Sequence, residues 1–166
     1  LSGVGDAATL KAHGIAVSHH APEVGRNLQD HILLGGCLWE PPAQIPMRNS
    51  AADSAFFFKS RPDLDTPDLY PVHIQIPYVS PVIAERLKPP PTCWAICPGL
   101  VRPLSRGELT LRSDKAEDKP RIQAGYLSDP ADVRALAHGV EMAREIGNSA
   151  AMKAFVKREV LPGPLK

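Results

Sequence analysis

The sequence predicts an α+β fold, because several segments typical of β-strands are followed by a long amphipathic helix. Residues 108–112 alternate polar and apolar side chains, with Leu109 and Leu111 on one face, as in a half-buried strand. Residues 129–147 instead repeat apolar side chains at three- and four-residue steps, as in a helix. A chain of 166 residues with 43% hydrophobic side chains can bury its own core, so we expect a single domain over residues 1–166.

A short helix is expected first, at Asp6–His13, with Asp6 as its cap, Leu10 facing inward and Gly14 at its end. The preceding Gly3-Val4-Gly5 is a very weak dinucleotide-binding signal, because a third glycine and a strand–helix–strand unit are both missing from the pattern.

Four segments between residues 31 and 101 are expected to be strands: His31–Trp39, Ser54–Lys59, Tyr70–Val79 and Thr92–Val101. Gly35 and Gly36 interrupt the first of these, and we expect a bulge there. Three consecutive phenylalanines favour burial of the second on both faces, with an exposed partner-binding patch as the alternative. In the third, alternation places Val72, Ile74 and Ile76 on one face and His73 and Gln75 on the other.

A β-hairpin is predicted over residues 102–127. Gly107 follows Pro103 and Ser105 and is expected to end a tight corner, where a residue without Cβ turns most easily. The polar residues 114–119 then form the turn, and a second short strand returns around Ile122.

The long helix begins at Asp129 and Pro130, since aspartate caps a helix and proline suits its first position. Its inward stripe is predicted from helical spacing and comprises Val133, Leu136, Ala137, Val140, Ala143 and Gly147. A second, short helix is expected at Ala150–Val156, with Phe155 facing inward.

Charge and cysteine content narrow the functional classes. A formal net charge of +1 predicts no electrostatic attraction to nucleic acid or to anionic membranes. No apolar run approaches the ~20 residues of a membrane-spanning helix. Three cysteines are a small and odd number, which favours a reducing compartment and hence the cytoplasm. Cys93 and Cys97 lack a second ligand pair, so we expect buried structural thiols and no metal site.

Two motifs carry a family resemblance. Residues 24–31 read VGRNLQDH, and the hairpin region reads Pro-x-Ser-Arg-Gly from Pro103, Pro-x-Ile from Pro120 and Tyr-Leu-x-Asp-Pro-x-Asp from Tyr126. In this order they resemble the glucose–methanol–choline (GMC) flavoprotein oxidoreductases of the choline dehydrogenase-like kind, and the resemblance covers Leu1 to Lys166. It implies a substrate-binding domain in which an antiparallel or mixed β-sheet is flanked by helices. The FAD-binding domain and the catalytic C-terminal segment of such an enzyme are expected to lie outside this chain.

The resemblance implies an oxidoreductase that acts on the CH–OH group of an alcohol by hydride transfer to FAD. We expect the chain alone to retain no FAD and to be inactive, because the family's ADP-binding unit and its catalytic motif are not part of it. Two alternatives stay open: a hydroxynitrile lyase of the same family, and a stand-alone module that binds a small ligand or a partner chain. Self-association through exposed apolar surface is also expected.

Candidate site residues follow from the resemblance. We assign one wall of the substrate cavity to His73, Gln75, Trp39 and Trp94, with a solvated face of the strand as the alternative for His73. Asn27 and His31 are assigned to cofactor binding, and a structural corner is the alternative, because side chains such as Asn and Asp commonly bond nearby backbone in turns. No residue is assigned to catalysis or to a metal.

Overall fold

The computed structural model describes residues 1–48 and 50–163, and the described chain divides into two compact units. Unit 1 comprises Leu1–Asp30 and Pro103–Pro130, and unit 2 comprises His31–Arg102 and Ala131–Lys166. Two such units can still fold cooperatively as one domain, so the single domain over residues 1–166 stays a prediction.

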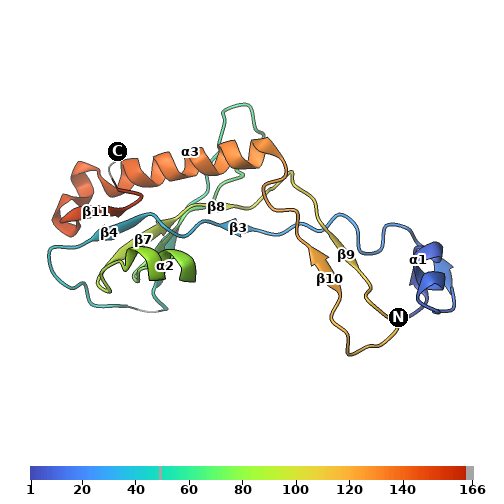
Figure 1. The fold of residues 1–166 in the computed structure, drawn as a ribbon. Coiled ribbons are helices and arrows are strands. Elements are labelled where there is room, and N and C mark those ends of the chain that lie inside the picture. The colour runs from blue at the N-terminus through green and yellow to red at the C-terminus, as the bar shows by residue number, and fades with distance from the viewer. Residues whose placement is uncertain (49, 164–166) are drawn as a thin grey trace. The chain divides into compact units, whose positions relative to one another are not determined.

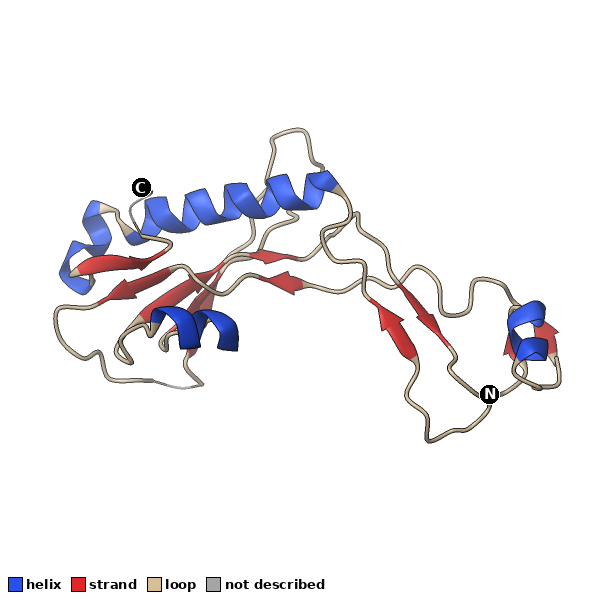
Figure 2. Cartoon of the chain, viewed as in Figure 1, coloured by secondary structure: helices blue, strands red, loops and turns tan. Residues whose placement is uncertain are grey.

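Unit 2 is built around a five-stranded antiparallel sheet (Figures 1 and 2). Its strands lie in the order β11 (Arg158–Leu161), β4 (Leu38–Glu40), β7 (Trp94–Cys97), β6 (Val72–Ile74) and β5 (Ala52–Ala55). A separate antiparallel pair joins β3 (Ile32–Leu33) to β8 (Gly99–Leu100). The helices of the unit are α2 (Pro81–Leu87), α3 (Pro130–Gly147) and the 3₁₀ turn η1 (Ala150–Phe155). Antiparallel strands flanked by helices confirm the predicted α+β class.

Both faces of the sheet are apolar, which explains why β7 reads as a continuous hydrophobic run. One face packs Cys37, Trp39, Trp94 and Ile96 against Ala143 of α3. The other face packs a second cluster, namely Leu38, Cys93, Ala95 and Cys97 with the flanking Ile74, Val79, Val160 and Leu161. Each fully buried large side chain contributes roughly 3 kcal/mol of hydrophobic stabilisation, so these two layers hold the unit together.

The long helix α3 follows the prediction only in part. Leu136, Ala143 and Gly147 of the predicted stripe are buried, but Val133 is 48% exposed and Ala137 is exposed. Small residues allow α3 to approach the segment at Pro98 closely, since a Cβ added at Gly139 would lie 3.0 Å from Cβ of Pro98. The buried stripe is therefore shifted around the helix, since Ala135 and Gly139 are buried in place of Val133 and Ala137.

Two aromatic predictions were wrong. The phenylalanine run was expected to be buried on both faces, yet Phe56 and Phe57 are 41% and 63% exposed. Strand β5 ends before them at the edge of the sheet, where one side has no neighbouring strand, and only Phe58 packs on the core. Phe155 was expected to face inward but is 49% exposed, because η1 is a 3₁₀ turn that repeats every three residues.

Gly35 and Gly36 interrupt the first predicted strand by a break, where a bulge was expected. The extended segment divides into β3 and β4, and Gly36 between them has a φ of 126°, in the region that favours glycine. The third predicted strand is likewise shorter than its alternation, since the ladder covers only Val72–Ile74.

Unit 1 contains the helix and the hairpin that the sequence predicts. Helix α1 (Ala7–Ala12) begins at Asp6, whose carboxylate accepts a 2.8 Å hydrogen bond from the Thr9 amide, and it buries Leu10. Strands β9 (Glu108–Thr110) and β10 (Arg121–Gln123) form the antiparallel hairpin. The sequence missed a minimal parallel pair, β1 (Val4–Gly5) with β2 (His19–His20), which α1 connects.

Candidate functional site

The VGRNLQDH segment forms a corner that is fastened along the β9–β10 hairpin. Leu28 and Gly107 exchange two backbone hydrogen bonds of 2.9 Å, and the Leu109 amide donates to the Gly25 carbonyl at 2.7 Å. Gly25 has a φ of 83°, and a Cβ there would lie 2.3 Å from the Leu109 carbonyl oxygen. A glycine is therefore required at position 25 both by its backbone conformation and by the close approach of the hairpin.

Gly107 is required for a reason other than the predicted one. Its φ is not positive, so it does not act as a turn glycine. Instead, a Cβ at this position would lie 2.2 Å from the carbonyl oxygen of Gln123 on the opposite strand. The signature glycine of the hairpin thus permits backbone contact on both sides, with Leu28 and with Gln123.

Alternate side chains of the corner bind the hairpin region. Arg26 forms an ion pair with Glu108, and the Tyr126 hydroxyl donates a hydrogen bond to Asp30. This bond, together with the nearby carboxylate charge, raises the pKa of Tyr126. The corner is therefore fixed by side chains as well as by backbone, which is the structural alternative that the sequence left open.

Like Val24, Arg26 and Asp30 of the same corner, Asn27 and Gln29 are exposed. Neither side chain makes a hydrogen bond within the part of the chain that the structure describes. Asn27 has a φ of 59°, the left-handed region that asparagine tolerates better than most residues. His31, which follows in unit 2, is exposed as well. The assignment of Asn27 and His31 to cofactor binding stays a prediction.

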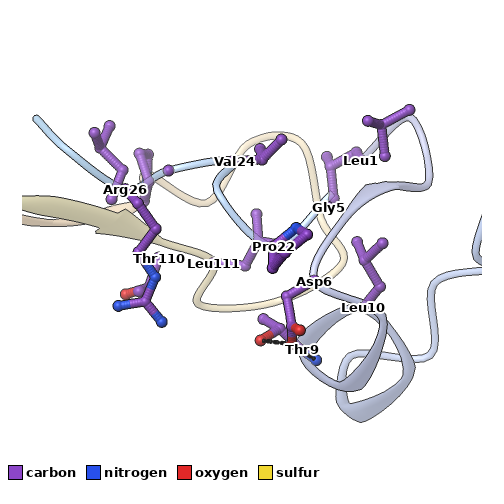
Figure 3. A pocket seen from close by; sticks show the side chains of 14 residues that line it. Leu1, Gly5, Asp6, Thr9, Leu10, Pro22, Val24, Arg26, Thr110 and Leu111 are labelled. Atoms are coloured by element: carbon purple, nitrogen blue, oxygen red, sulfur yellow. Dashed lines mark hydrogen bonds between the residues drawn. The ribbon is translucent and has the colours of Figure 1, made fainter. Parts of the chain in front are cut away.

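A cleft of about 200 Å³ lies within unit 1, where α1, the corner and β9 meet (Figure 3). Its wall is largely apolar and includes Leu10, Pro22, Val24, Leu109 and Leu111. Asp6, Thr9 and Arg26 supply polar groups to the lining. Pockets for drug-sized ligands are typically larger, about 300–1,000 Å³, so this cleft suits a small apolar group.

The polar groups of the cleft serve structural roles. The Asp6 carboxylate accepts hydrogen bonds from the amide and the hydroxyl of Thr9, both at 2.8 Å, which hold the pKa of Asp6 below its usual value. Arg26 is paired with Glu108. A small apolar group can be held here, and the Thr9 hydroxyl that donates to Asp6 belongs to the cap of α1.

The phosphates of FAD do not fit the Gly3–Gly5 turn. A phosphate at a helix start needs free amide donors and positive charge, but the Asp6 carboxylate already accepts the Thr9 amide and would repel a second anion. Helix α1 is also only six residues long. The short β1–α1–β2 unit is therefore not a dinucleotide-binding site.

Three of the four predicted substrate-binding residues lie together in unit 2. The rings of Trp39 and Trp94 stack with centroids 4.8 Å apart, and the His73 ring meets Trp94 edge-on at 5.5 Å. Trp39 and Trp94 are 0% and 3% exposed, and their indole Nε1 atoms donate to Asn148 Oδ1 and the Phe155 carbonyl. His73 is half-buried. In this chain both tryptophans serve the core between β4, β7 and α3, and their substrate role stays a prediction.

Gln75 is placed differently from the other three. Its side-chain Oε1 accepts a 2.7 Å hydrogen bond from the Arg48 amide, and its own amide donates to the Ala51 carbonyl. Gln75 therefore stabilises the turn near residue 51 through two hydrogen bonds. Its assignment to substrate binding also stays a prediction.

Sequence reasoning missed Glu159, a polar side chain of unit 2 with several partners. Its carboxylate accepts hydrogen bonds from Arg144 Nε at 2.8 Å, Asn148 Nδ2 at 2.7 Å and the Gly163 amide at 3.2 Å. Asn148 in turn accepts from Trp39, so the network joins α3, β4 and β11. The signal in the sequence was weak, namely one acidic residue between Arg158 and Val160.

The three cysteines are buried and free. Burial raises the pKa of Cys37 and Cys93 to about 11 and that of Cys97 to about 12. Thiols of this kind are weak nucleophiles at neutral pH. Across residues 1–48 and 50–163, no three His, Cys, Asp or Glu residues are grouped so that they could hold a metal ion. The same described residues include no helix with the length and apolarity to cross a membrane.

Comparison with known proteins gives consistent matches. A family model described as GMC oxidoreductase matches residues 103–166. The chain is 33% identical to an alcohol dehydrogenase [acceptor] from Pseudomonas putida, over 99% of this chain and 34% of that protein. It is also 33% identical to choline oxidase from Arthrobacter globiformis, over 98% of this chain and 30% of that protein.

A solved structure supports the same relationship. The crystal structure of pyridoxine 4-oxidase from Mesorbium loti matches with a TM-score of 0.84 at 25% identity, over 99% of this chain and 32% of that chain. The chain thus spans about a third of the length of the relatives that it matches. On these sequence and structural matches, the chain belongs to the GMC oxidoreductase family.

Proposed function

We propose that this chain is the substrate-binding part of an FAD-dependent oxidoreductase that oxidises the CH–OH group of an alcohol. When bound in the complete enzyme, FAD supplies the hydride acceptor. The observation that carries the proposal is the 33% identity to an alcohol dehydrogenase over 99% of this chain. Because that match covers only 34% of the relative, activity is proposed for the complete enzyme and not for these 166 residues alone.

In this proposal, the chain's own residues hold and orient the alcohol substrate. The antiparallel sheet of unit 2 gives a rigid support, since both of its faces are packed. On that sheet we propose His73 and Gln75 as substrate-facing residues, because they are the members of the predicted set that retain accessible surface. Trp39 and Trp94 would act by fixing the strands that carry them.

Asn27 and His31 are proposed as contacts to the flavin ring. The exposed Asn27 amide offers one acceptor and two donor hydrogens, and its corner is immobilised by the neighbouring Arg26 and Asp30. The imidazole of His31 is exposed too. No phosphate contact is proposed, because Asp6 excludes a second anion at the start of α1.

A lyase that cleaves cyanohydrins and a stand-alone binding module are the competing functions. The match to an alcohol dehydrogenase and to choline oxidase favours the oxidoreductase over both. The cytoplasm is our proposed location, supported by the three free thiols.

The test uses the complete protein that the encoding gene expresses, purified and mixed without oxygen with a series of primary alcohols. We expect the protein to show visible flavin absorbance and one of these alcohols to bleach it. The same alcohol should be required for reduction of a dye. Cyanide release from a cyanohydrin without bleaching would replace the proposal with the lyase. Absence of flavin from the complete protein would replace it with the binding module.

A further inference from the structure

A shallow hollow of about 600 Å³ on the β9–β10 hairpin is lined by Thr110, Leu111, Arg112 and Arg121. It lies entirely within unit 1. Both charged side chains of the lining are cationic and exposed, and no carboxylate lines the hollow. It is thus a small surface with a single sign of charge.

Strand register brings the donors together. Arg121 on β10 lies directly opposite Thr110 on β9, so the two side chains project from the same face of the hairpin. Arg112 follows Thr110 by two residues and lines the same hollow. The backbone thus presents two guanidinium groups and one hydroxyl toward one volume.

Two carboxylates of the hairpin are already bound elsewhere, and Asp114 and Glu117 of the turn do not line the hollow. Glu108 on the same hairpin pairs with Arg26, and Asp118 in the turn accepts a 2.6 Å hydrogen bond from the Ser113 hydroxyl. Within the described chain, neither Arg112 nor Arg121 forms an ion pair or a side-chain hydrogen bond. Two unpaired like charges on a narrow hairpin repel each other, and a bound anion would relieve that repulsion.

We propose that this hollow binds the phosphate group of a soluble phosphorylated small molecule. A guanidinium presents a planar fork of donors that matches phosphate oxygens in pairs, and the Thr110 hydroxyl supplies a further donor. Two fixed positive charges match a phosphate dianion better than a carboxylate monoanion. This site is independent of the proposed alcohol oxidation, and no residue of that proposal lines it.

Titration of the ¹⁵N-labelled 166-residue chain with inorganic phosphate, at constant ionic strength, tests the proposal by NMR. Saturable shifts are expected at Thr110, Arg112 and Arg121. Arg112→Gln and Arg121→Gln should each weaken binding by about tenfold, because each removes a charge-assisted pair of hydrogen bonds. Arg112→Lys should give an intermediate loss, since it keeps the charge but not the fork.

Arg86→Gln is the matched control, because Arg86 is an exposed arginine at the end of α2 in unit 2. It should bind phosphate as the unaltered chain does. Circular dichroism checks that the variants fold, and Arg112→Lys provides the comparison if a glutamine variant does not. Shifts that do not saturate, shifts confined to other residues, or equal binding by the unaltered chain and the folded hairpin variants would each overturn the proposal.

Discussion

The indole ring of Trp39 lies directly against Gly147 of α3, so that a Cβ added at Gly147 would lie 2.2 Å from Cζ2 of the ring. The same indole donates its Nε1 hydrogen to Asn148, one residue further along the chain. Helix and sheet therefore meet through a glycine and a tryptophan, and this contact fixes how closely α3 packs on β4.

Gly147→Ala is expected to destabilise the chain by about 3 kcal/mol, because the new methyl group overlaps a fully buried ring that cannot move away. Gly14→Ala is the matched control, since nothing lies within 4 Å of that position. Its left-handed backbone costs only about 1–2 kcal/mol with a Cβ. Urea unfolding measures both, and equal losses would contradict the packing of Trp39 on α3.

Glu159→Ala should lower the free energy of unfolding by about 2–3 kcal/mol, because it removes the acceptor of the Asn148 amide and leaves the partly buried Arg144 only the Gly163 carbonyl at 3.3 Å. Glu141→Ala on the exposed side of α3 should cost less than about 0.5 kcal/mol, since its side chain is 79% exposed and its contact with His138 is 3.8 Å long. Thermal unfolding of the two variants distinguishes a network centre from a surface ion pair. Similar midpoints of thermal unfolding for the two variants would show that Glu159 does not hold a stabilising network together.

Stability should fall at alkaline pH through the buried thiols. Their pKa values are about 11 to 12 in the folded chain and about 8.5 when unfolded, so the fold favours the neutral thiol. This contribution is fully present below pH ~8.5 and is lost, at about 1.4 kcal/mol per pH unit for each thiol, as the pH rises toward the folded values.

Urea unfolding at pH 8 and pH 10 measures this loss. Lysine and tyrosine also titrate in this range, so the contribution of the Cys97 thiol is the part of the loss that Cys97→Ala removes. An unchanged pH dependence in that variant would contradict the assignment.

We propose that exposed apolar side chains of unit 2 drive self-association. Met47, Phe57 and Val82 are 65%, 63% and 73% exposed. Light scattering should give a mass that rises above that of the monomer with concentration, and Phe57→Gln should shift the rise to higher concentration. A monomer mass for the unaltered chain at millimolar concentration would rule this out.

Local patterns predicted the elements whose causes are local. The cap at Asp6, the alternation of β9 and the helical spacing of α3 each depend on residues within a few positions of one another. The burial of Phe56 and Phe57 was mispredicted because it depends on β5 lying at the edge of the sheet, which no local pattern records.

The candidate site was likewise predicted only where its causes are local. The VGRNLQDH motif located the corner, but its attachment to Gly107, Glu108 and Tyr126 comes from residues about 80 to 100 positions away. Glu159 was missed for the same reason, since its partners gather only when α3 and β11 pack. Sequence therefore indicated where chemistry-bearing residues occur, and the fold decided which of them are structural.

The central claim is that this chain supplies the substrate side of a flavoenzyme and does not itself hold the dinucleotide. The most direct measurement is the visible spectrum of the purified 166-residue chain after incubation with FAD and removal of the unbound cofactor. The account predicts no flavin absorbance, because Asp6 occupies the helix start that a phosphate would need. One flavin retained per chain would contradict it.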